Sequence, residues 1–114
     1  MRVRPDTSPD FVAEIRLDPN QRDRFNRDGL VTGFTAAHAF HHPEGGLNDG
    51  VHFLVGRDVS PLGVVTRTEV WLLCPERQAG RLFPGFEFNI HSPSTVVGNG
   101  CITQVVNAKL AKQT

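Results

Sequence analysis

Apolar and polar residues alternate along several short segments of this chain, which is the pattern of strands that bury one face. Residues 11–17 place four apolar side chains on one face, beginning with Phe11, and the charged Glu14 and Arg16 on the other. Residues 86–91 alternate in the same way. Both segments are therefore predicted to be half-buried strands.

Four further strands are expected where β-branched and apolar residues are dense, although their period is less regular. They are residues 30–40, 51–55, 64–73 and 95–106. The last segment contains two glycines, so it is either one interrupted strand or two strands that meet at a corner. An apolar period of 3.6 residues is hard to find, which favours an all-β chain.

The connecting segments are rich in charged and turn-forming residues. Residues 18–29 are expected to form a solvated, charged loop with room for one helical turn. Residues 41–50 are expected to form a turn-rich loop that ends in an Asp-Gly turn pair at 49–50. Pro61 breaks the segment that follows residue 55.

About six short strands without helices between them predict a closed antiparallel β-barrel or a sandwich. The barrel is preferred because closure removes exposed edge strands. We therefore expect one β-barrel domain over residues 10–107, with a flexible arm at residues 1–9 and a frayed polar tail at residues 108–114.

Length and charge narrow the function without identifying it. A chain of 114 residues fits one domain with one core. Its 12 basic and 12 acidic residues cancel, which argues against a strongly basic nucleic-acid binder. The sequence begins without a signal-peptide pattern and holds no run near the roughly 20 apolar residues that span a bilayer. These features predict a cytoplasmic protein without membrane contact.

A more specific pattern lies in the second half of the chain. Residues 70–76 (VWLLCPE), 80–81 (GR), 84–88 (PGFEF) and 96–103 (VVGNGCIT) resemble the last three strands of the C-terminal β-barrel domain of elongation factor Tu. The resemblance covers about residues 10–107 and is strongest from Val64 onward. Its motifs specify fold better than activity.

The resemblance implies structural roles for several residues. Phe86 and Phe88 would fill the barrel, and the glycines Gly98 and Gly100 would let the last strand bend across it. Gly85, after a proline, suits the corner of a turn. Residues 18–40 depart from the family, so its contacts with tRNA and partner proteins do not transfer. The sequence also lacks a Gly-x-x-x-x-Gly-Lys-Ser/Thr loop, so no GTP site is expected on this chain.

Histidines and cysteines are the candidates for chemistry. His38, His41 and His42 are close enough in sequence to suggest a Zn²⁺ site, but no established ligand spacing supports it. Ordinary surface histidines that titrate near neutral pH are the simpler interpretation. Cys74 and Cys101 could form one disulfide, but a chain with a core of this size does not need one, so we expect free buried thiols. Neither has a base at a recognisable spacing, so we expect no catalytic residue and no cofactor.

Arginines and one tryptophan are the candidates for partner binding. Arg22, Arg24 and Arg27 would contact RNA phosphates, but aspartates alternate with them, so a solvated loop is the simpler interpretation. Trp71 faces away from its two apolar neighbours. We expect either a loop of the chain or a partner to cover it.

These observations support three functional hypotheses. The preferred one is a non-catalytic interaction module that binds a protein partner or a second copy, in a translation-related setting. The alternative is an RNA- or tRNA-binding module that uses the arginine-containing loop. A small enzyme of unknown chemistry is the third.

Overall fold

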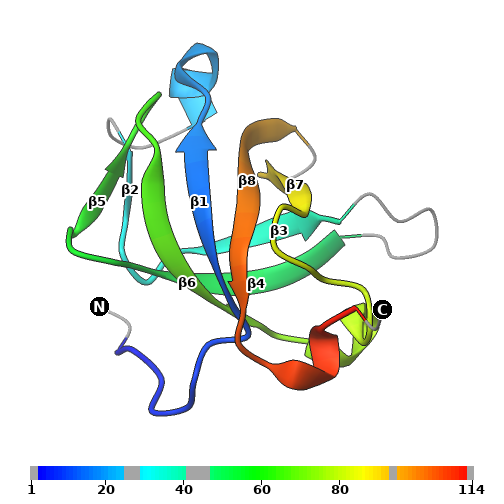
Figure 1. Cartoon of the computed structure of the whole chain (residues 1–114). Coiled ribbons are helices and arrows are strands. Elements are labelled where there is room, and N and C mark those ends of the chain that lie inside the picture. Colours follow the sequence, from blue (N-terminus) through cyan, green and yellow to red (C-terminus); the bar gives the residue numbers. More distant parts are fainter. Residues whose placement is uncertain (1–2, 25–28, 41–46, 93–94, 113–114) are drawn as a thin grey trace.

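The chain folds as an all-β domain (Figure 1). The computed structural model describes residues 3–24, 29–40, 47–92 and 95–112. In these ranges the strands are β1 (Phe11–Leu17), β2 (Gly29–Val31), β3 (Thr35–Ala39), β4 (Leu47–Leu54), β5 (Val59–Pro61), β6 (Thr66–Leu72), β7 (Glu87–His91) and β8 (Val96–Val105). The 3-10 helices are η1 (Pro19–Arg24), η2 (Pro75–Gln78) and η3 (Ala108–Leu110). No helix within the described ranges has the length and apolar character needed to cross a membrane.

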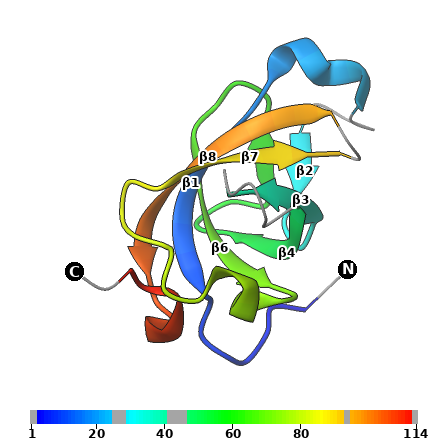
Figure 2. The same ribbon diagram turned by 90° about the vertical axis from the view of Figure 1, so that its right-hand side faces the viewer.

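Six strands close into an antiparallel barrel in the order β1-β6-β4-β3-β7-β8. β1 completes the closure, because it pairs with β6 on one side and with the last strand, β8, on the other. Figure 2, a quarter turn from Figure 1, shows the strands curving around a common interior. The predicted all-β class and the closed barrel of six antiparallel strands are confirmed.

The barrel interior is filled by the apolar faces of the alternating strands. Phe11, Phe40 and Phe88 form a buried group of rings, with centroids 5.5 to 6.1 Å apart. Ile15 and other aliphatic side chains pack around them. Phe86 differs from Phe88 because it is only partly buried and packs against this core from its edge.

Two glycines in β8 allow close packing while the strand stays continuous over 10 residues. A Cβ at Gly100 would overlap the ring of Phe88, and one at Gly98 would lie 2.7 Å from the backbone oxygen of Arg16. The single-strand alternative is therefore the one adopted. Gly85 has a φ of 95° in the turn before β7, a conformation that suits glycine.

The expected single strand at residues 30–40 is wrong, because the chain forms two strands there. Gly33, with a φ of 91°, lies between them. β2 leaves the barrel and pairs with β5 in a small antiparallel sheet. Pro61 was expected to break its segment, yet it ends β5 opposite Gly29. A proline is tolerated at such an edge because no further strand needs its missing N–H.

The predicted turn at residues 49–50 is also wrong, since both residues lie inside β4. Gly50 pairs with Leu72 of β6. A Cβ at Gly50 would lie 2.9 Å from Cε1 of His38. The glycine is therefore needed for the close approach of a histidine ring. In the sequence, an Asp-Gly pair that serves this packing looks the same as one that forms a turn.

Both ends of the described chain lie toward the same end of the barrel (Figures 1 and 2). The expected frayed tail needs correction, because residues 108–110 form η3 and Leu110 is buried. A backbone bridge also joins Leu82 to Ala111. Burial of Leu110 in the core makes this segment part of the folded domain.

Replacing Gly100 with alanine should destabilise the barrel, because the new methyl group displaces the ring of Phe88. We expect the free energy of unfolding to fall by about 1–3 kcal/mol, as in other overpacked cores. Urea unfolding near neutral pH measures the change. Asn99→Ala, at the exposed neighbouring position, is the control and should change stability by less than about 0.5 kcal/mol.

The double variant Gly100→Ala/Phe88→Leu identifies the cause. Its loss of stability should be smaller than the sum of the two single losses, because the smaller side chain leaves room for the methyl group. Strictly additive losses would contradict the assigned contact.

Candidate interaction surface

The outer surface of β4 and β6 carries an apolar cluster that is separate from the main core. The cluster consists of Val51, Phe53 and Trp71. Val51 lies opposite Trp71 in the ladder, and the rings of Phe53 and Trp71 meet edge to face with centroids 5.7 Å apart. All three side chains are at most 9% exposed although they face out of the barrel. Another part of the chain must therefore cover them.

The outward rows continue beyond this cluster at both ends. Leu73 follows β6 and is 59% exposed, while Val55 follows β4 and is 44% exposed. Backbone hydrogen bonds from Leu73 to Asp49 and from Val55 to Arg67 keep both residues in line with the ladder. We define the β4–β6 wall as Val51, Phe53, Val55, Glu69, Trp71 and Leu73.

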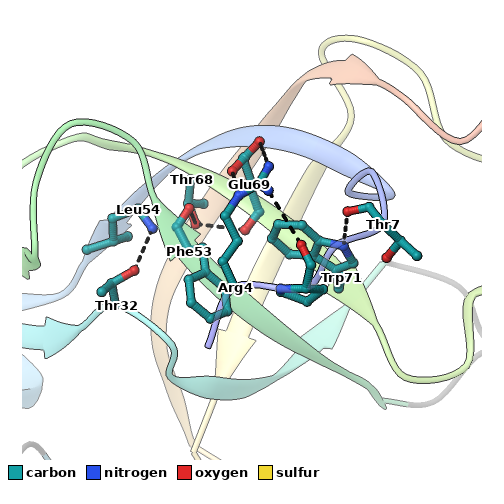
Figure 3. Close-up of polar contacts among 9 residues, drawn as sticks. Arg4, Thr7, Thr32, Phe53, Leu54, Thr68, Glu69 and Trp71 are labelled. Atoms are coloured by element: carbon teal, nitrogen blue, oxygen red, sulfur yellow. Dashed lines mark hydrogen bonds and ion pairs between the residues drawn. The ribbon is translucent and has the colours of Figure 1, made fainter. Parts of the chain in front are cut away.

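The N-terminal segment, residues 3–9, covers the middle of this wall (Figure 3), and we call it the arm. Nε and Nη2 of Arg4 donate to the two carboxylate oxygens of Glu69, each at 2.9 Å. The guanidinium carbon of Arg4 lies 5.1 Å from the centroid of the Trp71 ring. Nε1 of Trp71 donates to the backbone oxygen of Thr7 at 3.2 Å.

The sequence predicted that either a loop of the chain or a partner covers Trp71, and the arm is that covering segment. The side chain does face away from Val70 and Leu72, and a segment of the chain itself covers it. Trp71 is therefore not an open patch in this structure. The arm was expected to be flexible, but it makes specific contacts at Arg4 and Thr7. The guanidinium of Arg4 binds Glu69, and the carbonyl of Thr7 accepts from Trp71.

The candidate RNA-binding arginines are not brought together with Trp71. Arg22 is exposed on η1, Arg24 ends that helix, and Arg27 lies outside the described residues. Figures 1 and 2 place η1 and the arm toward opposite ends of the barrel. Asp18 accepts a hydrogen bond from the backbone of Asn20 at 2.9 Å, so one acidic residue of this loop helps to shape η1.

Two histidines face each other inside the barrel. His38 of β3 and His52 of β4 are both fully buried, with their Nε2 atoms 2.7 Å apart. Phe34 stacks on His52 with centroids 4.5 Å apart, and Phe40 stacks on His38 at 5.9 Å. The pair is therefore enclosed between aromatic rings, away from solvent.

The hydrogen-bond partners decide where the protons lie. Nδ1 of His38 lies 2.8 Å from the backbone oxygen of Asn48, which can only accept, so this nitrogen donates. Nε2 of His38 then accepts from Nε2 of His52. Nδ1 of His52 lies 3.2 Å from the hydroxyl of Thr68 and can accept its hydrogen, which the backbone oxygens of Glu69 and Phe53 also face at 3.2 and 3.4 Å. Both rings are thus satisfied as neutral imidazoles.

Burial sets the charge state of this pair, because a charged imidazole loses its hydration inside the barrel. Burial lowers the pKa of His38 to about 4, and it lowers the pKa of His52 well below its usual value. Asp49 raises the pKa of His38 in part, whereas His91 lowers it further. Both buried rings are neutral at neutral pH.

The predicted histidine cluster is different from the pair that forms. His38 is not a surface histidine, and His41 and His42 lie outside the described residues. His52, which sequence reasoning passed over, is its partner. The available signal was parity, because Ala36, His38 and Phe40 are alternate residues of one strand face. Among the described residues, no group of three or more side chains could hold a metal ion.

The two cysteines are free, but the expectation that both are buried is wrong. Cys74 is exposed after the end of β6, and Cys101 is half-buried on β8. Cys101 lies between Glu14 of β1 and Glu87 of β7 in the ladder. These residues line a groove of about 530 Å³.

The function of this chain has to be inferred from its own geometry. No protein-family model matches the chain, and no curated protein matches it. The resemblance to the elongation factor Tu barrel therefore depends on sequence motifs alone, and these are strongest in the second half of the chain.

Acidification should destabilise the barrel through the histidine pair. Because the folded-state pKa of His38 lies below the ordinary value of 6.5, the unfolded chain binds protons first as pH falls. The contribution of the neutral His38 ring to the free energy of unfolding is fully present above pH 6.5 and is lost as the pH falls toward 4. His38 alone should remove roughly 2 kcal/mol between about pH 7 and 5. Urea unfolding at a series of pH values measures this slope.

Matched variants assign the slope to the buried pair. The double variant His38→Leu/His52→Leu should flatten the dependence of stability on pH, whatever its absolute stability. His91→Gln, which changes a half-buried histidine outside the pair, should leave most of the slope in place. An unchanged slope in the double variant would contradict the assignment.

Proposed function

We propose that this chain is a non-catalytic β-barrel interaction module that binds a protein partner through the β4–β6 wall. The observation that carries the proposal is a continuous apolar row on two neighbouring strands, with its centre under the arm and its ends, Val55 and Leu73, exposed. Contiguous apolar surface of this kind is typical of protein interfaces, and tryptophan is enriched at their energetic centres.

The resemblance to the C-terminal barrel of elongation factor Tu supports a translation-related, cytoplasmic setting. The resembling motif at residues 70–76 includes Trp71, near the end of β6. The exposed free thiol of Cys74 fits a reducing compartment. We assign no catalytic residue and no GTP-dependent step to this chain.

A second candidate function is binding of RNA or tRNA. The exposed position of Arg22 on η1 favours it. Asp23 is exposed next to Arg22, however, and its charge reduces the local positive potential that would attract phosphates. We therefore prefer a protein partner.

A photoreactive amino acid at position 73 should crosslink the partner in cells. Leu73 is 59% exposed on the wall, so this replacement should leave the fold intact. We expect a discrete protein adduct, detected by its mobility and identified by mass spectrometry. Adding Val55→Glu should abolish the adduct, because it places a charge on the same apolar row.

The same photoreactive residue at position 99 is the control, because β8 lies opposite β4 in the strand order of the barrel. It should not give this adduct. An adduct that persists with Val55→Glu, or that forms equally from position 99, would contradict the proposed wall. A nuclease-sensitive adduct formed from position 22 instead would favour the RNA alternative.

A further inference from the structure

Polar contacts from Arg4 and Thr7 join the arm to the wall, while the two prolines of the arm, Pro5 and Pro9, are half-buried and buried. Val3 is 83% exposed, and the side chain of Arg4 is 51% exposed while it is paired with Glu69. An ion pair with this much exposure contributes little to stability. The contacts of Arg4 with Glu69 and Trp71 are therefore specific in geometry but weak enough to exchange.

The contacts define what kind of segment fits the wall. Glu69 binds the planar guanidinium through two parallel hydrogen bonds, which lysine cannot reproduce. Trp71 receives the cation on its face and donates its indole N–H to a carbonyl three residues after the arginine. An extended chain with an arginine and a free carbonyl at that spacing satisfies both wall residues.

We propose that the arm is an internal stand-in for the partner's binding segment. On this inference, which rests on the proposed function, the partner presents an extended, arginine-bearing segment that displaces the arm. Its arginine binds Glu69 and Trp71, and its backbone carbonyl three residues later accepts from Trp71. The arm thereby inhibits the wall until the partner competes it away.

The exposed ends of the wall explain how a separate protein can displace a tethered arm. A tethered segment has a high effective concentration, so a competitor needs additional contacts. Val55 and Leu73 remain exposed beside the arm and offer those contacts. A partner with apolar residues beside its arginine would cover Val55 and Leu73. The arm leaves both of these side chains exposed.

The test is binding of a fluorescent peptide with the arm sequence Val-Arg-Pro-Asp-Thr-Ser-Pro to the 114-residue chain. Arg4→Ala loosens the tethered arm, so this variant should bind the peptide at least about tenfold more tightly than the wild-type chain. Adding Glu69→Gln should reverse the gain. Adding Glu14→Gln, which changes an exposed carboxylate on β1, should preserve it.

Peptide variants keep the test decisive even where a protein variant folds poorly. A peptide with lysine in place of arginine should bind the Arg4→Ala protein more weakly, and one with alanine should not bind detectably. Equal binding of all three peptides would overturn the inference, as would absence of peptide binding to a folded Arg4→Ala protein. Dimerisation of the wild-type chain that the peptide reverses would assign the wall to a second copy's arm and also overturn it.

The outcomes separate this inference from the proposed function. Loss of peptide binding together with a Val55-dependent crosslink from position 73 would leave a protein-binding wall whose ligand is not arm-like. Peptide binding without any such crosslink would refute a protein partner at the wall, while arginine recognition by Glu69 and Trp71 would be retained as a property of the arm alone.

Discussion

Closure of the barrel depends on Asp10, which holds the first strand against the strands on both sides. Its carboxylate accepts from the backbone N–H of Leu72 at 2.7 Å and from the side-chain amide of Asn107 at 2.9 Å. Its backbone oxygen also accepts from the N–H groups of Val106 and Asn107. A carboxylate that is 8% exposed is costly without such partners. Because the partners come from the end of β6 and from the segment that follows β8, the charge is satisfied only when β1 lies between these two strands.

Closure also gives every barrel strand an inner and an outer face. The inner faces carry the histidine pair, and the outer faces of β4 and β6 carry the β4–β6 wall. Inside, His38 and His52 are stable as neutral rings because Asn48 and Thr68 complete their hydrogen bonds. Outside, the next residues along the same strands form the β4–β6 wall. A single alternation in β4 therefore places His52 in the barrel interior and Phe53 on the outer face of the barrel.

The sequence predicted what depends on local pattern. Alternation located β1 and β7, and the absence of a helical period favoured an all-β chain. The need to avoid exposed edge strands then favoured the barrel, which is the observed architecture. The sequence pattern could not distinguish a glycine required for packing from one required for a turn, so the turn predicted at Gly50 is wrong. The pairing of His38 with His52, and of Arg4 with Glu69, depends on strand register and on closure. Those contacts join distant residues and leave no local signal.

The anchoring of Asp10 also explains why the arm contacts this wall. Asp10 donates its backbone N–H to the carbonyl of Val70, so the arm starts beside the end of β6. Six residues back, Arg4 reaches Glu69, the neighbour of Val70 on the opposite face of the strand. The closed barrel therefore delivers the arm to the wall at the position where Arg4 meets Glu69. A cover positioned by its tether can be weak in its own contacts, and a weak cover leaves the wall available to a stronger ligand.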